Sequence, residues 1–170
     1  SKENQKKIEK LFSNKLLEKI TFIEGGNSRN ESEFIALSHL GEQLIDGSDL
    51  VVIHDAARAF LTPNLLERLI LHALEFGSAS PYLYSGLLVD EKKEIANEEI
   101  VEIQTPQIFD FENLMSAYKK ANIDSFDSVD TTECISKYTN ITPQLIEGEI
   151  INKKITYKKD ICELRELLSV

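Results

Sequence analysis

The sequence predicts an α/β protein in which a mainly parallel sheet is flanked by helices. Short apolar runs alternate with amphipathic stretches along the chain, a pattern typical of strands joined by helices that cover a sheet. The 170 residues are 42% apolar, which is enough for one ordinary hydrophobic core. No internal repeat or low-complexity linker divides them, so we expect a single domain over residues 1–170.

The first half of the chain is predicted to alternate helices and strands. Apolar residues at helical spacing predict the first helix, and a short apolar run that ends at Gly25-Gly26 predicts the first strand. Leu50–Ile53 is the most strand-like run of the sequence. Thr62 is a natural N-cap residue and is followed by Pro63, which suits the first position of a helix. The expected helices cover residues 3–17, 31–45 and 63–76, and the expected strands cover residues 20–23 and 49–54.

The second half is predicted to begin with a strand and to end with an amphipathic helix. Asp110 is expected to cap a helix. Residues 84–104 have an acidic, polar centre between two apolar runs, and two interpretations carry equal weight: a protruding β-hairpin arm, or a solvated loop. The other expected helices cover residues 111–120, 129–138 and 158–168, and the other expected strands cover residues 78–83, 144–147 and 154–156.

Composition limits the partners and the compartment. A net charge of −10 argues against nucleic-acid backbones and anionic membranes as partners, and no apolar run is long enough to span a bilayer. No signal peptide opens the sequence. Cys134 and Cys162 make neither a disulfide framework nor a zinc site, and both fall in helix-like patterns. We therefore expect a cytoplasmic protein with neither nucleic acid nor membrane as a partner.

The apolar strand after residue 49 stops abruptly at a His-Asp-Ala-Ala-Arg turn. Ligands of open α/β sheets bind beyond the carboxyl ends of the strands. At such an end Asp55 could hold a hard cation such as magnesium, and Arg58 could bind a phosphate through two nitrogen atoms. Taken alone, however, the turn is more often a helix cap with an ion pair. A metal phosphohydrolase is a poor fit, because His39 and His72 would supply too few additional ligands.

A glycine-rich segment follows the first predicted strand. Gly25 and Gly26 permit a tight turn and close approach of a ligand to the backbone, while Asn27 and Ser32 could bind a base or a ribose. Two glycines before a helix are more often only a turn. Neither a Walker-type loop nor a GxGxxG loop is present.

Three other polar segments have ordinary structural explanations when each is taken alone. Residues 105–107, Thr-Pro-Gln, are interpreted as a turn before a helix, and Lys154 as a solvated surface lysine beside a strand. Four acidic residues recur at intervals of three, which is not the spacing of a calcium loop and suits helix N-termini. They are Asp124, Asp127, Asp130 and Glu133.

The order of these segments indicates a family more strongly than any one of them. GGNSRNES, VVIHDAAR, TPQIF and LIEGEIINKKIT follow one another along the chain. This order resembles the 2-C-methyl-D-erythritol 4-phosphate cytidylyltransferase family, which carries a GGxxRxxS loop, a V-x-HDAARP strand end, a TPQxF turn and an EGxxxNxKxT segment. The resemblance covers about residues 1–168. Bacterial ribitol-5-phosphate cytidylyltransferases are similar, but more often have HDSVRP in place of HDAARP.

The resemblance implies a nucleotidyltransferase with a Rossmann-like sheet. Its reaction would transfer CMP from CTP to a sugar-alcohol phosphate, 2-C-methyl-D-erythritol 4-phosphate, in the non-mevalonate isoprenoid pathway, with release of pyrophosphate. The family also implies a magnesium cofactor and a homodimer formed through the arm at residues 84–104.

The same resemblance implies roles for eight residues. Asp55 would hold magnesium and the nucleotide. Arg58, Thr105 and Lys154 would act on the acceptor phosphate and on the phosphoryl group in transfer. The residues implied to bind the nucleotide with Asp55 are Gly26, Asn27, Ser32 and Ala56.

The sequence departs from the family pattern in the turn and in the arm. Ala59 stands where the family has the proline of HDAARP. Tyr84-Ser85 stands where the family has an Asp-Thr pair that touches the acceptor, and Asn97 stands near the place of an arginine that binds the acceptor phosphate across the dimer. These departures leave the acceptor open, and they favour ribitol 5-phosphate as the alternative substrate.

A last departure concerns the N-terminal part of the family pattern. Family members begin with a strand and a glycine-rich loop, AAGxGxRM, that cradles the triphosphate, and this sequence contains neither. We therefore expect a chain truncated at its N-terminus, inactive alone and a poor binder of CTP. A further alternative is a non-catalytic binding or dimerisation module that has lost the triphosphate loop.

Overall fold

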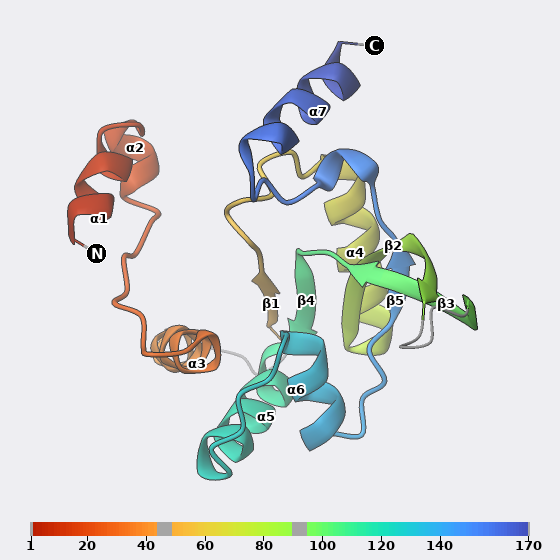
Figure 1. The fold of residues 1–170 in the computed structure, drawn as a ribbon. Coiled ribbons are helices and arrows are strands. Elements are labelled where there is room, and N and C mark those ends of the chain that lie inside the picture. Colours follow the sequence, from red (N-terminus) through yellow and green to blue (C-terminus); the bar gives the residue numbers. More distant parts are fainter. Residues whose placement is uncertain (1, 44–48, 90–94, 170) are drawn as a thin grey trace.

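The computed structural model describes residues 2–43, 49–89 and 95–169, and shows an α/β fold in which helices flank a five-stranded sheet (Figure 1). This confirms the predicted class. The helices are α1 (Lys2–Glu9), α2 (Asn14–Leu17), α3 (Arg29–Gly41), α4 (Pro63–Phe76), α5 (Phe111–Ile123), α6 (Thr131–Tyr138) and α7 (Lys158–Leu168), with a 3₁₀ turn at Ile150–Asn152. The strands are β1 (Leu50–Ile53), β2 (Ser78–Val89), β3 (Ile95–Ile103), β4 (Gln107–Asp110) and β5 (Leu145–Glu147).

The strand directions differ from the mainly parallel sheet that the sequence predicts. The order is β1-β4-β2-β3, and β5 pairs with β2. Within the described ranges, β4 runs antiparallel to both β1 and β2, the pair β2–β3 is antiparallel, and only the pair β2–β5 is parallel. The physical reason is β4, a strand that the sequence pattern indicated only as a turn. It returns directly from β3 and enters the sheet between two strands that share the opposite direction.

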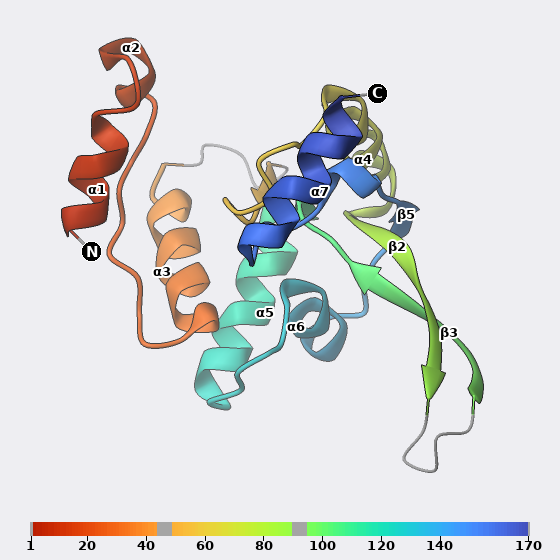
Figure 2. The same ribbon diagram turned by 45° about the horizontal axis from the view of Figure 1, so that its top comes forward.

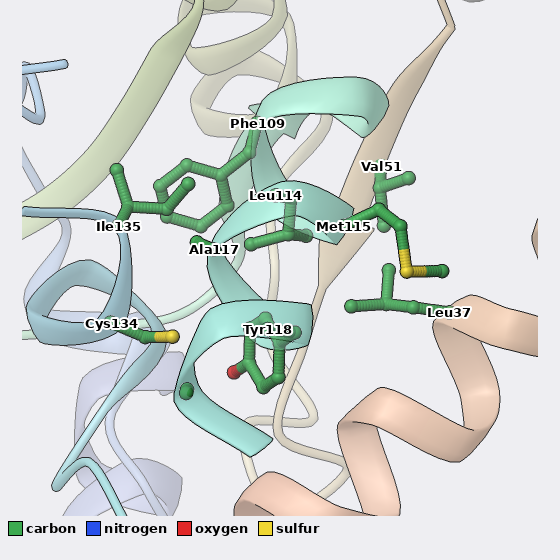
Figure 3. Packing of buried hydrophobic residues seen from close by; sticks show 10 residues of the cluster. Leu37, Val51, Phe109, Leu114, Met115, Ala117, Tyr118, Cys134 and Ile135 are labelled. Carbon is green, nitrogen blue, oxygen red and sulfur yellow. The ribbon is translucent and has the colours of Figure 1, made fainter. Parts of the chain in front are cut away.

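β4 also separates two hydrophobic cores. Ile108 and Phe109 are neighbours, so their side chains point to opposite faces of the sheet. Ile108 packs with Leu65 and Leu69 of α4. Phe109 packs on the other face among side chains of α5 and α6, as Figure 3 shows. The second core comprises Leu37, Val51, Phe109, Leu114, Met115, Ala117, Tyr118, Ala121, Cys134 and Ile135.

The helix boundaries agree well with their sequence signals. The Thr62 hydroxyl accepts a hydrogen bond from the Leu65 amide at the start of α4, and Gly77 ends that helix with a φ of 78°, which favours glycine. Asp110 caps α5, as predicted, by accepting from the Asn113 amide. α7 covers the predicted residues 158–168.

Three predicted elements are corrected by the structure. Residues 3–17 form two short helices, α1 and α2, because the chain turns at residues 10–13, where the Leu11 amide donates to the Ile8 carbonyl at 2.9 Å. Residues 20–23 form no strand: Thr21, Phe22 and Ile23 are exposed, and none of the described strands pairs with them. Residues 154–156 are also not a strand. In both views α1 and α2 stand apart from the sheet, beyond α3 (Figures 1 and 2).

β2 and β3 form a long hairpin that protrudes from the body of the fold (Figure 2). Tyr82 pairs with Ile103 and Tyr84 with Val101, so the base of the arm is regular antiparallel sheet. This decides between the two interpretations of residues 84–104 in favour of a β-hairpin. The described part of the structure does not include residues 90–94 or the side chains of Ser85 and Asn97. Ser85 and Asn97 are two of the positions at which the sequence departs from the family pattern.

Within the described ranges, the structure contains no helix that is long and apolar enough to cross a membrane.

Candidate active site

The turn after β1 is held in place by the segment that precedes β4. The Asp55 amide donates to Thr105 Oγ1 at 2.9 Å, and the Arg58 amide donates to the Asp55 carbonyl at 2.9 Å. The His54 ring lies between Thr105 Oγ1, 3.1 Å from its Nδ1, and the Arg58 carbonyl, 3.0 Å from its Nε2. A carbonyl only accepts, so Nε2 donates to it, and in the neutral ring Nδ1 then accepts from the hydroxyl. His54 therefore braces the turn.

Arg58 is a buried cation with a fixed position. Its side chain is 5% exposed, and its guanidinium donates to the carbonyls of Asn152 at 2.9 Å and Ile103 at 3.5 Å. Its carboxylate neighbours, Asp55 and Glu102, lie 3.9 Å away. Burial lowers the pKa of Arg58, and the two carboxylates act in the opposite direction. The expected Asp55–Arg58 ion pair therefore exists, but backbone carbonyls hold the guanidinium.

Lys154 reaches the same carboxylate from the other end of the chain. Its Nζ lies 2.9 Å from Asp55 Oδ2, and the next amide, that of Ile155, donates to the Ala57 carbonyl at 2.9 Å. Burial alone would raise the pKa of Asp55. The hydrogen bond and charge of Lys154, followed by the charges of Arg58 and Arg29, outweigh burial, so the pKa of Asp55 is lowered and the group is a carboxylate at neutral pH.

These groups line one cavity of about 320 Å³. It brings together all four predicted catalytic residues, Asp55, Arg58, Thr105 and Lys154, although they come from three distant parts of the chain. Three cationic and two anionic side chains line it, so the positive charges are in excess and favour an anionic ligand. The lining residues are Arg29, Asp55, Arg58, Ile103, Thr105, Gln107, Val129, Asp130 and Lys154.

Three polar lining residues were not assigned to a site from the sequence: Arg29, Gln107 and Asp130. The first two lie inside the GGNSRNES and TPQIF segments, so the motifs already contained a signal for them. Asp130 was interpreted as a helix-terminal acid, and its side chain does cap α6 by accepting from the Glu133 amide. No sequence signal indicated that its second oxygen would reach the cavity.

Arg29 is aimed by a largely buried carboxylate of its own helix. Arg29 Nε donates to Glu33 Oε1 at 2.7 Å, and Nη1 donates to the Val129 carbonyl at 2.9 Å. Glu33 also accepts from the Tyr118 hydroxyl and, at 3.2 Å, from Thr131 Oγ1. Burial, reinforced by the charge of Glu33, raises the pKa of Tyr118, so this phenol stays protonated as a donor.

The glycine-rich segment lies beside the cavity and contributes only Arg29 to its wall. The Gly26 amide donates to Ser32 Oγ at 3.0 Å, and Ser32 Oγ donates to the Ser28 carbonyl at 2.8 Å. Both capacities of that hydroxyl are therefore used to brace the loop. Gly26, Asn27, Ser32 and Ala56 are not among the residues that line the cavity, and their predicted contacts with a nucleotide stay predictions.

The carboxylates of the cavity suit one kind of metal site. In the described part of the chain, no cluster of three or more His, Cys, Asp or Glu residues could hold an ion. Magnesium is usually held by one or two carboxylates together with water and substrate phosphates. Asp55, whose Oδ2 lies 2.9 Å from Lys154 Nζ, fits that donor set, whereas in the described part of the chain a closed site made by protein groups alone does not fit.

Comparisons with known proteins give the same family as the motifs. The model of the 2-C-methyl-D-erythritol 4-phosphate cytidylyltransferase family, IspD, matches residues 1–169. A bifunctional enzyme IspD/IspF of Rhodopseudomonas palustris is 34% identical over 146 residues, which are 80% of this chain and 35% of that protein. The cytidylyltransferase of Clostridium novyi is 30% identical over 166 residues, 91% of this chain and 68% of the relative. The chain thus spans about a third of the bifunctional relatives it matches.

Solved structures agree with the sequence comparisons. The crystal structure of 2-C-methyl-D-erythritol 4-phosphate cytidylyltransferase from Thermus thermophilus superposes with a TM-score of 0.74 at 27% identity, over 88% of this chain and 74% of that one. The bifunctional IspDF of Campylobacter jejuni gives a TM-score of 0.70 at 29% identity, over 88% of this chain and 39% of that one. The chain belongs to the 2-C-methyl-D-erythritol 4-phosphate cytidylyltransferase family.

Proposed function

We propose that the full-length protein transfers CMP from CTP to 2-C-methyl-D-erythritol 4-phosphate and releases pyrophosphate, as a step of non-mevalonate isoprenoid biosynthesis. Family membership supports the reaction class. The observation that carries the proposal is the single cavity in which Asp55, Arg58, Thr105 and Lys154 meet.

The chemistry asks for positioning and charge neutralisation more than for proton transfer. An oxygen of the acceptor phosphate forms a bond to the α-phosphorus of CTP, the bridging bond between the α- and β-phosphates breaks, and its electron pair leaves with pyrophosphate. The attacking phosphate is already an anion, so no base is required. Arg58 supplies a fixed cation. Lys154, whose side chain is 48% exposed, can exchange its contact with Asp55 for a phosphate oxygen.

Thr105 serves this site in two ways in the proposal. Its hydroxyl accepts from the Asp55 amide, which fixes the carboxylate relative to β4. Its carbonyl accepts from Asn152 Nδ2 at 2.8 Å, which ties the segment carrying Lys154 to the same point.

We assign magnesium to Asp55, together with phosphate oxygens of the substrates. Bound there, the ion would neutralise charge on the transferring phosphoryl group. Gly26, Asn27 and Ser32 are assigned to cytidine and Ala56 to the nucleotide beside Asp55. The exposed position of Asn27 and Ala56 supports these assignments.

The assembly and the compartment are further parts of the proposal. A homodimer through the arm is supported by the way in which β2 and β3 protrude from the fold (Figure 2). A cytoplasmic setting is supported by two free cysteines, Cys134 and Cys162.

Replacing Asp55 tests the reaction directly. Asp55→Asn keeps the shape and removes the charge, and it should lower kcat/KM of the full-length enzyme by about 100-fold or more, with an increased requirement for magnesium. Asp55→Ala should lose at least as much. Pyrophosphate release is the measurement, and Asp49→Asn, immediately before the other end of β1, is the matched control. Unchanged turnover in Asp55→Asn would remove this carboxylate from the mechanism.

The same assay compares acceptors. Tyr84-Ser85 and Asn97 replace residues that the family pattern directs at the acceptor, and this observation favours ribitol 5-phosphate as the second candidate. Values of kcat/KM for the two acceptors, measured side by side with CTP, decide between them. Transfer to neither acceptor, with CTP still bound, would instead support a non-catalytic binding module.

A further inference from the structure

Gln107 is the first residue of β4 and lies against the end of β1, the strand that leads to the turn with Asp55. It pairs in the sheet with Ile53, two residues before Asp55, and its side chain is buried, with the residue 1% exposed. It lines the cavity together with Asp55, Arg58 and Lys154. A buried amide at this place is either fully bonded within the protein or available to an occupant of the cavity.

The orientation of that amide is fixed by Asp130. Gln107 Nε2 donates to Asp130 Oδ2 at 3.2 Å, while Asp130 Oδ1 accepts from the Glu133 amide at 2.9 Å. A carboxylate can only accept, so the NH₂ group of Gln107 must face Asp130. Oε1 is consequently the atom that Gln107 can offer to a ligand, and a carbonyl oxygen recognises only a donor.

Two buried polar atoms of residues that line this cavity lack a hydrogen-bond partner in the protein, and Arg58 Nε has only its ion pair with Asp55 at 3.9 Å. Within the described residues, three buried side-chain atoms have no hydrogen-bond partner: Gln107 Oε1, Arg58 Nε and Asn152 Oδ1. The first two belong to lining residues of the same cavity. Unpaired buried groups are costly, so two of them in one polar cavity indicate an occupant that satisfies both.

The two atoms define complementary chemistry. Arg58 Nε requires an acceptor, such as a phosphate oxygen, and Gln107 Oε1 requires a donor, such as a hydroxyl group. A sugar-alcohol phosphate has both. We propose that Gln107 is a specificity-determining residue that binds one hydroxyl group of the acceptor polyol through Oε1, with Asp130 as the positioning residue that holds the amide. This inference rests on the function proposed above and adds a residue to it.

A double-mutant cycle, in which one change is made in the protein and the other in the ligand, tests the contact between Gln107 and the hydroxyl group. The full-length enzyme is assayed with CTP and with the acceptor or its monodeoxy analogues, each of which lacks one hydroxyl group. For the wild type, one analogue should lose about 10- to 100-fold in kcat/KM, because a site built to bond a hydroxyl group rejects the analogue without it. Gln107→Met keeps the length of the side chain but removes Oε1. In this variant, kcat/KM for the same analogue should be less than about threefold below kcat/KM for the full acceptor.

Gln104→Met is the matched control. Gln104 is also 1% exposed, but both ends of its amide are bonded, by Nε2 to the Glu149 carbonyl and by Oε1 from the Glu149 amide, and it does not line this cavity. Its replacement should lower the melting temperature and leave the discrimination between acceptor and analogue as in the wild type.

The outcomes separate the two proposals. The inference is overturned if each analogue lowers kcat/KM by the same factor in Gln107→Met as in the wild type. In that case Oε1 binds only a buried water molecule. A wild-type enzyme that discriminates among the analogues while transferring CMP supports the function whatever Gln107 does. A wild type that transfers CMP to no polyol phosphate overturns the function, and the inference with it.

Discussion

Asp55 is the residue on which the charges of the cavity converge. Lys154 lies 2.9 Å from its carboxylate, Arg58 lies 3.9 Å away, and Arg29 adds a longer-range contribution. Such an arrangement keeps a carboxylate ionised in a partly buried place, and it also holds Lys154 near the point where a phosphate would enter.

The lowered pKa of Asp55 gives a prediction at the residue scale. Removing the lysine in Lys154→Met should raise the pKa of Asp55, because the hydrogen bond and nearest positive charge are the strongest influences that oppose burial. The titration of the Asp55 carboxyl carbon, followed by NMR, measures the change. Any stability that the pair contributes is present above the ordinary pKa of an aspartate and is lost as the pH falls through the lowered value.

Lys153→Met is the control for that titration. Lys153 pairs with Glu163 and Asp160 and not with Asp55, so its removal should leave the Asp55 midpoint in place. An unchanged midpoint in Lys154→Met would show that the pair does not govern ionisation of Asp55.

Site residues were predictable where a motif marks them. Asp55, Arg58, Thr105 and Lys154 are each ordinary when taken alone, and the order of the motifs is what assigns them to one site. Gln107 and Arg29 lie within the same motifs but carried no assignment. Asp130 was beyond prediction, because its contact with Gln107 depends on how α6 packs against the sheet.

At the scale of single elements, α4 shows how a sequence signal translates into stability. Thr62 Oγ1 accepts from the Leu65 amide at 3.1 Å and donates to Glu149 Oε2 at 2.7 Å, so one hydroxyl caps the helix and ties it to the segment before the 3₁₀ turn. The helix it starts carries Leu65 and Leu69 into one core.

Thr62→Ala should therefore lower the free energy of unfolding by about 0.5–2 kcal/mol, the usual range for loss of an N-cap. Thr62→Ser should retain most of the stability. Denaturant titration measures both, and Thr142→Ala, at an exposed position, should stay within about 0.5 kcal/mol of the wild type. Equal midpoints for Thr62→Ala and the wild type would contradict the role of the cap.

Elements with local signals were predictable, and elements that depend on a partner were not. Thr62, Pro63 and Asp110 mark helix starts through bonds within a few residues, and those starts are correct. The strand expected at residues 20–23 has strand composition but no described neighbour to pair with. β4 is the reverse case, a strand that the sequence did not predict. Its four residues are too few to show a periodicity, and they form a strand only because they pair with β1 and β2.

For the whole molecule, the arm formed by β2 and β3 protrudes from the body of the fold (Figure 2). Tyr84 pairs with Val101 where β2 and β3 leave the sheet, so the arm can be removed at that pair without breaking the pairing below it. Replacing residues 84–101 by a short turn should halve the mass of the full-length assembly in sedimentation experiments, if the arms join two copies.

The rival surface for a dimer is the outer face of α4, where Leu71 and Leu74 are exposed. Leu74→Ser should leave the sedimentation of the full-length protein unchanged. A dimer that survives loss of the arm, or that dissociates in Leu74→Ser, would contradict assembly through the arm.

β4 gives the molecule a property that neither core nor cavity has alone. Within four residues it places Gln107 in the cavity wall, Ile108 in one core and Phe109 in the other. A strand shared in this way cannot open locally, because freeing Gln107 would expose both hydrophobic layers at once. We therefore expect this part of the cavity wall to belong to the cooperative unfolding unit of the protein, so that a ligand bound against it would stabilise the whole domain against unfolding.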